Sequence, residues 1–125
     1  MKKNYTPIIL FAYKRLEHTQ RTIESLLRNP ISSSTDLFVY LDGPRSEEDI
    51  SQVNAVKGFV KNIKGFKSLN IKERQSNFGL SKNILGGVSE VLGVHKDAII
   101  VEDDLVTSQY FLEYMNTSIL EYLNT

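Results

Sequence analysis

The chain has 125 residues, of which 41% are hydrophobic and 24% are charged, and its fifteen basic side chains balance fifteen acidic ones. These values predict one folded domain rather than a disordered segment, without bulk attraction to nucleic acid or to an anionic membrane. The absence of cysteine excludes disulfides, thiolate zinc sites and cysteine nucleophiles. Because the apolar runs are too short to span a bilayer, and none of signal-peptide length precedes Pro7, we expect a cytoplasmic location.

Strand and helix signals alternate along the whole chain. Continuous apolar runs predict strands covered on both faces, and apolar residues spaced by three and four predict the helices between them. In chain order we expect a strand at 8–13, a helix that ends before Pro30, a loop at 32–35, a strand at 37–41, a helix from Ser46 to Ile63, a strand at 69–73, a helix after Ser81, a strand at 98–101 and a last helix after Thr107 or Ser108. This order predicts a single α/β domain over residues 1–125, Rossmann-like, with a mostly parallel four-stranded sheet and helices on both faces.

Local signals refine these elements. Ser46 followed by Asp49 resembles a capping box, and Thr107 or Ser108 is expected to cap the last helix. The pair Gly86-Gly87 inside the third helix costs about 1 kcal/mol per residue against alanine, which predicts close packing or a bend. The apolar face expected of the last helix consists of Tyr110, Phe111, Tyr114, Met115, Ile119 and Leu123.

Polar residues gather where the expected strands end. In a parallel sheet these carboxyl ends meet at one edge, where open α/β folds bind their ligands. The residues concerned are Lys14 and Arg15 after the first strand, Asp42 after the second, Asn77 after the third, and Glu102, Asp103 and Asp104 after the fourth. We therefore expect a functional site at this edge. The chain contains no GxSxG, P-loop or GxGxxG motif, so the hydrolase, NTPase and dinucleotide-binding classes are not indicated.

The acidic triplet suggests a metal ion. If the strand stays extended, Glu102 and Asp104 share one side and Asp103 points to the other. Oxygen ligands without histidine or cysteine suit Mn²⁺ or Mg²⁺ rather than zinc, and such an ion is held by one or two carboxylates together with water and phosphate oxygens. The natural partner is thus a diphosphate. The alternative is a solvated strand end, or charges that favour the dipole of the next helix.

The other polar residues each have a structural alternative. Arg15 suits stacking on a nucleobase or hydrogen bonding to it or to its phosphates, but with Lys14 it can equally form a solvated helix edge. Asp42 can accept hydrogen bonds from a base or ribose, or only from its own backbone in an Asx-turn. Lys82 and Asn83 can be surface residues or ligand contacts.

Four blocks together, "PIILFAYKR", "LFVYLDGP", "SNFGLSKNI" and "AIIVEDDL", resemble the nucleotide-sugar-binding half of GT-A glycosyltransferases over nearly the whole chain. Within that superfamily, "VEDDL" followed by "YFLEYMN" is most similar to the inverting N-acetylglucosaminyltransferase I-like enzymes and their bacterial relatives. The triplet stands where most of these proteins have Asp-x-Asp. The resemblance also implies that the first and fourth strands are neighbours in the sheet.

The resemblance implies a role for each site residue. Arg15 would contact the uridine and Asp42 the uracil, while Asn77 replaces a residue near the base that can be histidine in the family. Asp104 would bind Mn²⁺ or Mg²⁺ directly, with Glu102 and Asp103 holding hydroxyls of the sugar and ribose or waters of the metal. The nucleotide-sugar-binding residues expected are Ala12, Tyr13, Arg15, Asp42, Asn77, Lys82, Glu102 and Asp103, with Asp104 as the metal ligand.

The implied activity is transfer of a sugar from a UDP-sugar donor to a hydroxyl of a saccharide or glycoconjugate acceptor, with inversion, in bacterial polysaccharide biosynthesis. In the family the general base follows well beyond the triplet, so we expect it after Thr125. We therefore expect the chain to be the donor-binding fragment of a longer enzyme, inactive alone, whose full-length form is cytoplasmic or peripheral at the inner membrane.

Two alternatives remain open. The first is a non-catalytic nucleotide-binding or interaction module of the same fold. The second is a receiver-type phosphoryl-transfer domain, which needs its acidic pair after the first strand, where this chain has Lys14 and Arg15.

Overall fold

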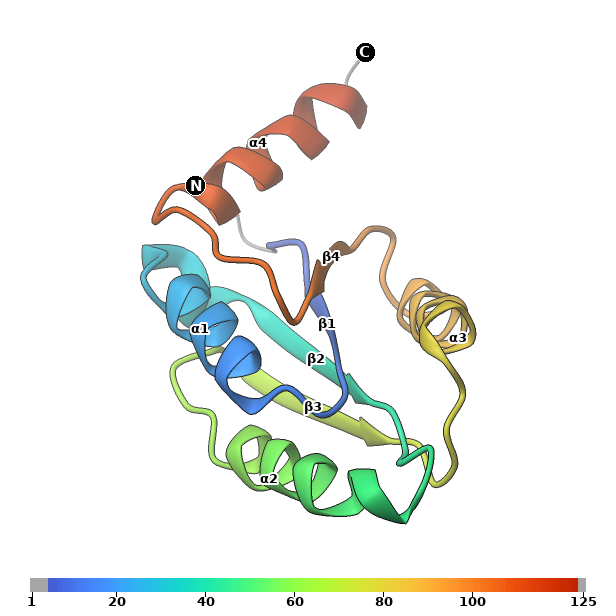
Figure 1. Cartoon of the computed structure of the whole chain (residues 1–125). Coiled ribbons are helices and arrows are strands. Elements are labelled where there is room, and N and C mark those ends of the chain that lie inside the picture. The colour runs from blue at the N-terminus through green and yellow to red at the C-terminus, as the bar shows by residue number, and fades with distance from the viewer. Residues whose placement is uncertain (1–4, 124–125) are drawn as a thin grey trace.

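Strands and helices alternate from one end of the chain to the other (Figure 1). The structure is a computed structural model that describes residues 5–123, with side chains described up to residue 120. Its elements are β1 (Ile8–Ala12), α1 (Leu16–Leu27), the 3-10 helix η1 (Pro30–Ser34), β2 (Asp36–Leu41), the 3-10 helix η2 (Glu47–Asp49), α2 (Ile50–Lys61), β3 (Ser68–Glu73), α3 (Leu80–Leu92), β4 (Ile99–Glu102) and α4 (Phe111–Leu123). The expected order of strands and helices is confirmed, although 30–34 forms a short helix where a loop was expected.

All four strands are parallel and lie in the order β3-β2-β1-β4, so the α/β fold class is confirmed. β1 pairs with β2 on one side and with β4 on the other. At the carboxyl edge of the sheet, Ala12 is in register with Leu41, and Phe11 is in register with Glu102. The segments that follow these three strands therefore begin side by side.

Helices cover both faces of the sheet. On one face, side chains of α1, α2 and α4 pack against alternate residues of the strands, such as Leu10 and Val39. On the other face α3 packs alone against Ile9, Phe11 and Tyr40. Figure 1 shows α3 on the side of the sheet opposite to α1 and α2.

Close packing, rather than a bend, explains the glycine pair of α3. A Cβ atom added to Gly87 would stand 2.7 Å from Cε1 of Phe11 and 3.2 Å from Cδ1 of Tyr40. The helix is continuous from Leu80 to Leu92. Gly87 thus allows α3 to lie directly on the aromatic rings of β1 and β2.

Neither predicted cap forms as expected. Ser46 makes no capping hydrogen bond, because the carboxylate of Asp49 binds Tyr13 and Lys14 instead of closing a capping box. At the other end of the chain, Thr107 is buried and its backbone N–H and hydroxyl both donate to Oγ of Ser25.

The first turn of α4 is capped from a distant part of the sequence. The side-chain oxygen of Asn29, just after α1, accepts the backbone N–H of Leu112 at 2.9 Å. Ser108 has a smaller role ahead of the helix, where its hydroxyl accepts the backbone N–H of Tyr110. A cap supplied across the fold has no signal in the local sequence.

The buried face of α4 is rotated from the one predicted. Leu112 is fully buried, whereas Tyr110 and Tyr114 are 63% and 68% exposed. Phe111, Met115 and Ile119 pack against the core as expected, and the side chain of Leu123 lies outside the described residues. Within residues 5–123, no helix has the length and apolar character needed to cross a bilayer.

Candidate functional site

A hollow of about 350 Å³ lies at the carboxyl edge of the sheet, within the size range of small-molecule sites. Segments that follow β1, β2 and β4, together with the start of α3, contribute to it. Its lining consists of Phe11, Ala12, Tyr13, Lys14, Arg15, Asp42, Leu80, Asn83, Glu102, Asp103 and Asp104. The structure therefore brings together seven of the nine predicted site residues, all except Asn77 and Lys82.

The three acids after β4 form one wall of this hollow, here called the acidic wall (Glu102, Asp103 and Asp104). β4 ends at Glu102, and the next two residues form a turn in which the N–H of Leu105 donates to the carbonyl oxygen of Glu102 at 3.3 Å. The strand does not stay extended beyond Glu102, but the burial of the three side chains still alternates as expected. Asp103 is buried, Glu102 and Asp104 are exposed, and all three line the same hollow.

Arg15 reaches the acidic wall from the end of β1. Its Nη2 lies 3.2 Å from Oδ1 of Asp103, and this ion pair joins a side chain that is 53% exposed to one that is 11% exposed. Burial raises the pKa of Asp103, the guanidinium of Arg15 opposes the rise, and the neighbouring charges of Asp104 and Glu102 add to it. One cation thus only partly offsets the charge of three adjacent carboxylates.

Asp42 lines the opposite side of the hollow, and its buried carboxylate holds together the segments 42–43 and 77–79, here called the Asp42 wall, of which Asp42 alone is a lining residue. Oδ1 of Asp42 accepts the backbone N–H groups of Gly43 at 2.9 Å and Phe78 at 2.7 Å. Oδ2 accepts the N–H of Gly79 at 3.1 Å and the side-chain amide of Asn77 at 3.3 Å. The Asx-turn alternative is therefore wrong, because the residue two positions on is Pro44, which has no N–H, and three of the four hydrogen bonds come from 77–79. Asp42 instead fixes the loop that leads into α3.

Asn77 and Lys82 do not line the hollow. The amide of Asn77 lies behind Asp42 and also donates to the carbonyl oxygen of Gly43 at 2.9 Å. Lys82 is exposed, and its Nζ lies 4.8 Å from the centre of the Phe78 ring. From the first turn of α3, Leu80 and Asn83 line the hollow instead.

Arg74 supports the Asp42 wall, but it is not among the site residues predicted from the sequence. Its buried guanidinium lies 5.1 Å from the ring centre of Tyr40 and 4.7 Å from that of Phe78. Its Nε donates to Oδ1 of Asn83 at 3.2 Å. Arg74 directly follows β3, so the rule that flagged the polar residues after the other strands could have found it.

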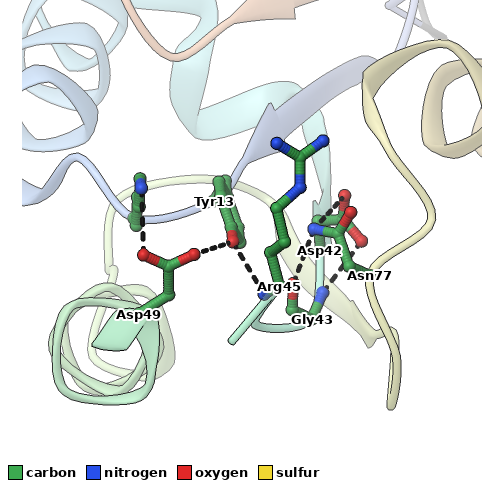
Figure 2. A network of polar contacts seen from close by, with 7 residues as sticks. Tyr13, Asp42, Gly43, Arg45, Asp49 and Asn77 are labelled. Atoms are coloured by element: carbon green, nitrogen blue, oxygen red, sulfur yellow. Dashed lines mark hydrogen bonds and ion pairs between the residues drawn. The ribbon is translucent and has the colours of Figure 1, made fainter. Parts of the chain in front are cut away.

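A third network fixes the segment that follows β1 (Figure 2). The hydroxyl of Tyr13 donates to Oδ2 of Asp49 at 2.7 Å, and Nζ of Lys14 lies 3.0 Å from Oδ1. These two hydrogen bonds lower the pKa of Asp49, while burial and the bond to Asp49 raise the pKa of Tyr13. Asp49, which the sequence suggested as a helix cap, instead holds two consecutive residues of the hollow in place.

The acids of the hollow suit a cation that is shared with a ligand. Among the described side chains, no group of three or more histidine, aspartate and glutamate residues is arranged to hold a metal by itself. Glu102 and Asp104 nevertheless offer oxygen ligands on either side of Asp103. Mn²⁺ and Mg²⁺ need only one or two such carboxylates when a diphosphate supplies further oxygens, so the donor set fits an ion brought in by a diphosphate.

No protein-family model matches the chain, and no curated protein is significantly similar to it. A functional proposal for this chain therefore rests on the geometry of the hollow.

Proposed function

We propose that the chain binds the UDP-sugar donor of an inverting, metal-dependent glycosyltransferase, whose acceptor is a saccharide or glycoconjugate. The observation that supports this proposal most strongly is the hollow at the carboxyl edge of the sheet, with the acidic wall and Arg15 on one side and the Asp42 wall on the other. Parallel α/β sheets bind nucleotides at this edge. The proposal includes the cytoplasmic location expected from the sequence.

The charges of the hollow favour a ligand that arrives with a divalent cation. Four carboxylates line it, Asp42 and the three of the acidic wall, against the two cations Lys14 and Arg15. Both cations already pair with carboxylates of the protein. A diphosphate alone would be repelled by the excess of negative charge, whereas a diphosphate with Mn²⁺ or Mg²⁺ would not.

Each wall then has its own role in donor binding. Asp104, with Glu102 beside it, would hold the metal ion, and Asp103 would keep Arg15 at the diphosphate. When bound, the ion supplies Lewis-acid stabilisation of the negative charge that develops on the departing nucleoside diphosphate. Ala12 and Tyr13 would lie against the nucleoside, and the Asp42 wall would fit the base. We assign the general base to none of the described residues.

Calorimetric titration with UDP tests the proposal. For the wild type, Mn²⁺ should raise the affinity for UDP about tenfold or more, because one charge-assisted interaction is worth about 1.5–3 kcal/mol. Asp104→Asn should remove most of this gain. Glu24→Gln, an exposed acid on α1, is the matched control and should bind as the wild type does. UDP affinity that is the same with and without Mn²⁺ in all three proteins would contradict the proposal.

A further inference from the structure

One cation beside the hollow, Arg45, has an unpaired guanidinium, unlike its neighbours Lys14 and Arg15. Lys14 is bonded to Asp49 at 3.0 Å, and Arg15 to Asp103 at 3.2 Å. Arg45, in the loop after β2, uses its backbone N–H to donate to the hydroxyl of Tyr13 at 2.9 Å. Its guanidinium makes no hydrogen bond or ion pair with any other described residue, so all five of its N–H donors are available to a ligand.

The backbone that carries Arg45 is held at two points, Gly43 and Arg45 itself. Before it, the N–H of Gly43 donates to Asp42, and the carbonyl oxygen of Gly43 accepts the amide of Asn77. At Arg45 itself the bond to Tyr13 ties the loop to the segment after β1. An anchored backbone limits where the side chain can reach.

Figure 2 shows the Arg45 side chain extending between Tyr13 and Asp42 toward the end of β1. Tyr13 and Asp42 both line the hollow, whereas Arg45 is exposed and is not a lining residue, so its side chain lies outside the lining and next to two residues that belong to it. A planar guanidinium matches phosphate oxygens with two parallel N–H donors. The ligand class that this cation fits is therefore one with a phosphate group.

We infer that Arg45 captures a phosphate group of the ligand beside the hollow, and so makes the site select a phosphorylated nucleotide over the free nucleoside. The inference rests on the proposed function for the identity of the nucleotide. Arg45 complements the metal ion: the ion offsets the charge of the acidic wall, and Arg45 adds positive charge from the loop on the other side.

The test compares the full chain with Arg45→Gln and with Arg28→Gln, an exposed arginine just after α1. Binding of UDP, uridine and inorganic pyrophosphate is measured by calorimetry in the presence of Mn²⁺, at low and at high salt. Circular dichroism verifies that the variants are folded. Arg45→Gln should weaken the binding of UDP and pyrophosphate about tenfold at low salt and less at high salt, because salt screens an exposed charge. Uridine should bind to it within about twofold of the wild-type affinity, and Arg28→Gln should match the wild type throughout.

Each outcome separates the inference from the proposed function. Two outcomes contradict the inference and leave the proposed function standing, provided that the wild type binds UDP. In the first, Arg45→Gln binds UDP as tightly as the wild type does. In the second, the substitution lowers the affinity for uridine as much as the affinity for UDP. If the wild type binds pyrophosphate through Arg45 but neither UDP nor uridine, the inference stands and the uridine-nucleotide function is wrong. If the wild type binds none of the three, both are wrong.

Discussion

The two walls of the hollow use their carboxylates in opposite ways. Asp42 is buried, and its two oxygens accept four hydrogen bonds from the chain itself. On the acidic wall, Asp103 has one ion pair with Arg15, and the side chains of Glu102 and Asp104 have no hydrogen bond or ion pair with other described residues.

This difference separates an acid whose hydrogen bonds are taken up by the fold from acids whose oxygens are free to bind a ligand. The carboxylate of Asp42 gains stability for the protein by fixing the loop at 77–79. Glu102 and Asp104 add no such stability, and the three acids of the acidic wall repel one another. Local conflicts of this kind are typical of functional sites. The comparison therefore predicts that substitutions on one wall change stability, while those on the other change binding.

The largest effect on stability is expected from Asp42→Ala. It leaves the N–H groups of Phe78 and Gly79 without their acceptor and frees the loop, which should lower the free energy of unfolding by about 3 kcal/mol. Asp104→Ala, on the exposed acidic wall, should change it by no more than about 0.5 kcal/mol. Urea unfolding followed by circular dichroism measures both. Equal losses of unfolding free energy in the two variants would contradict the different roles of the two walls.

Gly43→Ala tests the same wall by steric means. A Cβ atom at this position would stand 2.7 Å from the backbone carbonyl carbon and oxygen of Ser76, and backbone atoms cannot rotate away as a side chain can. Such overpacking should cost about 2 kcal/mol of unfolding free energy.

Gly58→Ala is the control for that substitution. No atom lies within 4 Å of its added Cβ, and Gly58 lies inside α2, so alanine should leave stability unchanged or raise it by about 1 kcal/mol. If Gly43→Ala behaved like Gly58→Ala under the same urea titration, the tight contact between the loop after β2 and the loop after β3 would be wrong.

A further effect, which appears only at high pH, is expected from Tyr40, whose ring lies beside Arg74. Burial and its hydrogen bond to Glu90 raise the pKa of Tyr40 to about 12. The folded state disfavours the ionised phenol of Tyr40. The free energy of unfolding should therefore not depend on this group below about pH 10 and should fall as the pH rises from about 10 to 12. Ultraviolet absorbance at rising pH should show Tyr40 ionising later than the exposed tyrosines. A titration in which every tyrosine ionises near pH 10 would contradict this assignment.

The fold was predictable because its signals are local. Apolar runs and helical spacing define β1 to β4 and the helices between them, and strict alternation then leaves few topologies. The residues that converge at the strand ends followed from the same reasoning. What the sequence could not indicate depends on contacts between distant segments: Asn29 capping α4, Asp49 holding Tyr13, and Arg74 lying between Tyr40 and Phe78.

The most direct test of the central claim is the position of Mn²⁺ when it is bound together with UDP. In ¹⁵N-labelled protein, the paramagnetic ion broadens the amide signals of nearby residues. We expect selective broadening at 12–15 and 102–104, with the amides at 67–69, at the other edge of the sheet, unaffected. Broadening that is uniform along the chain, or that is centred away from the end of β4, would contradict the account.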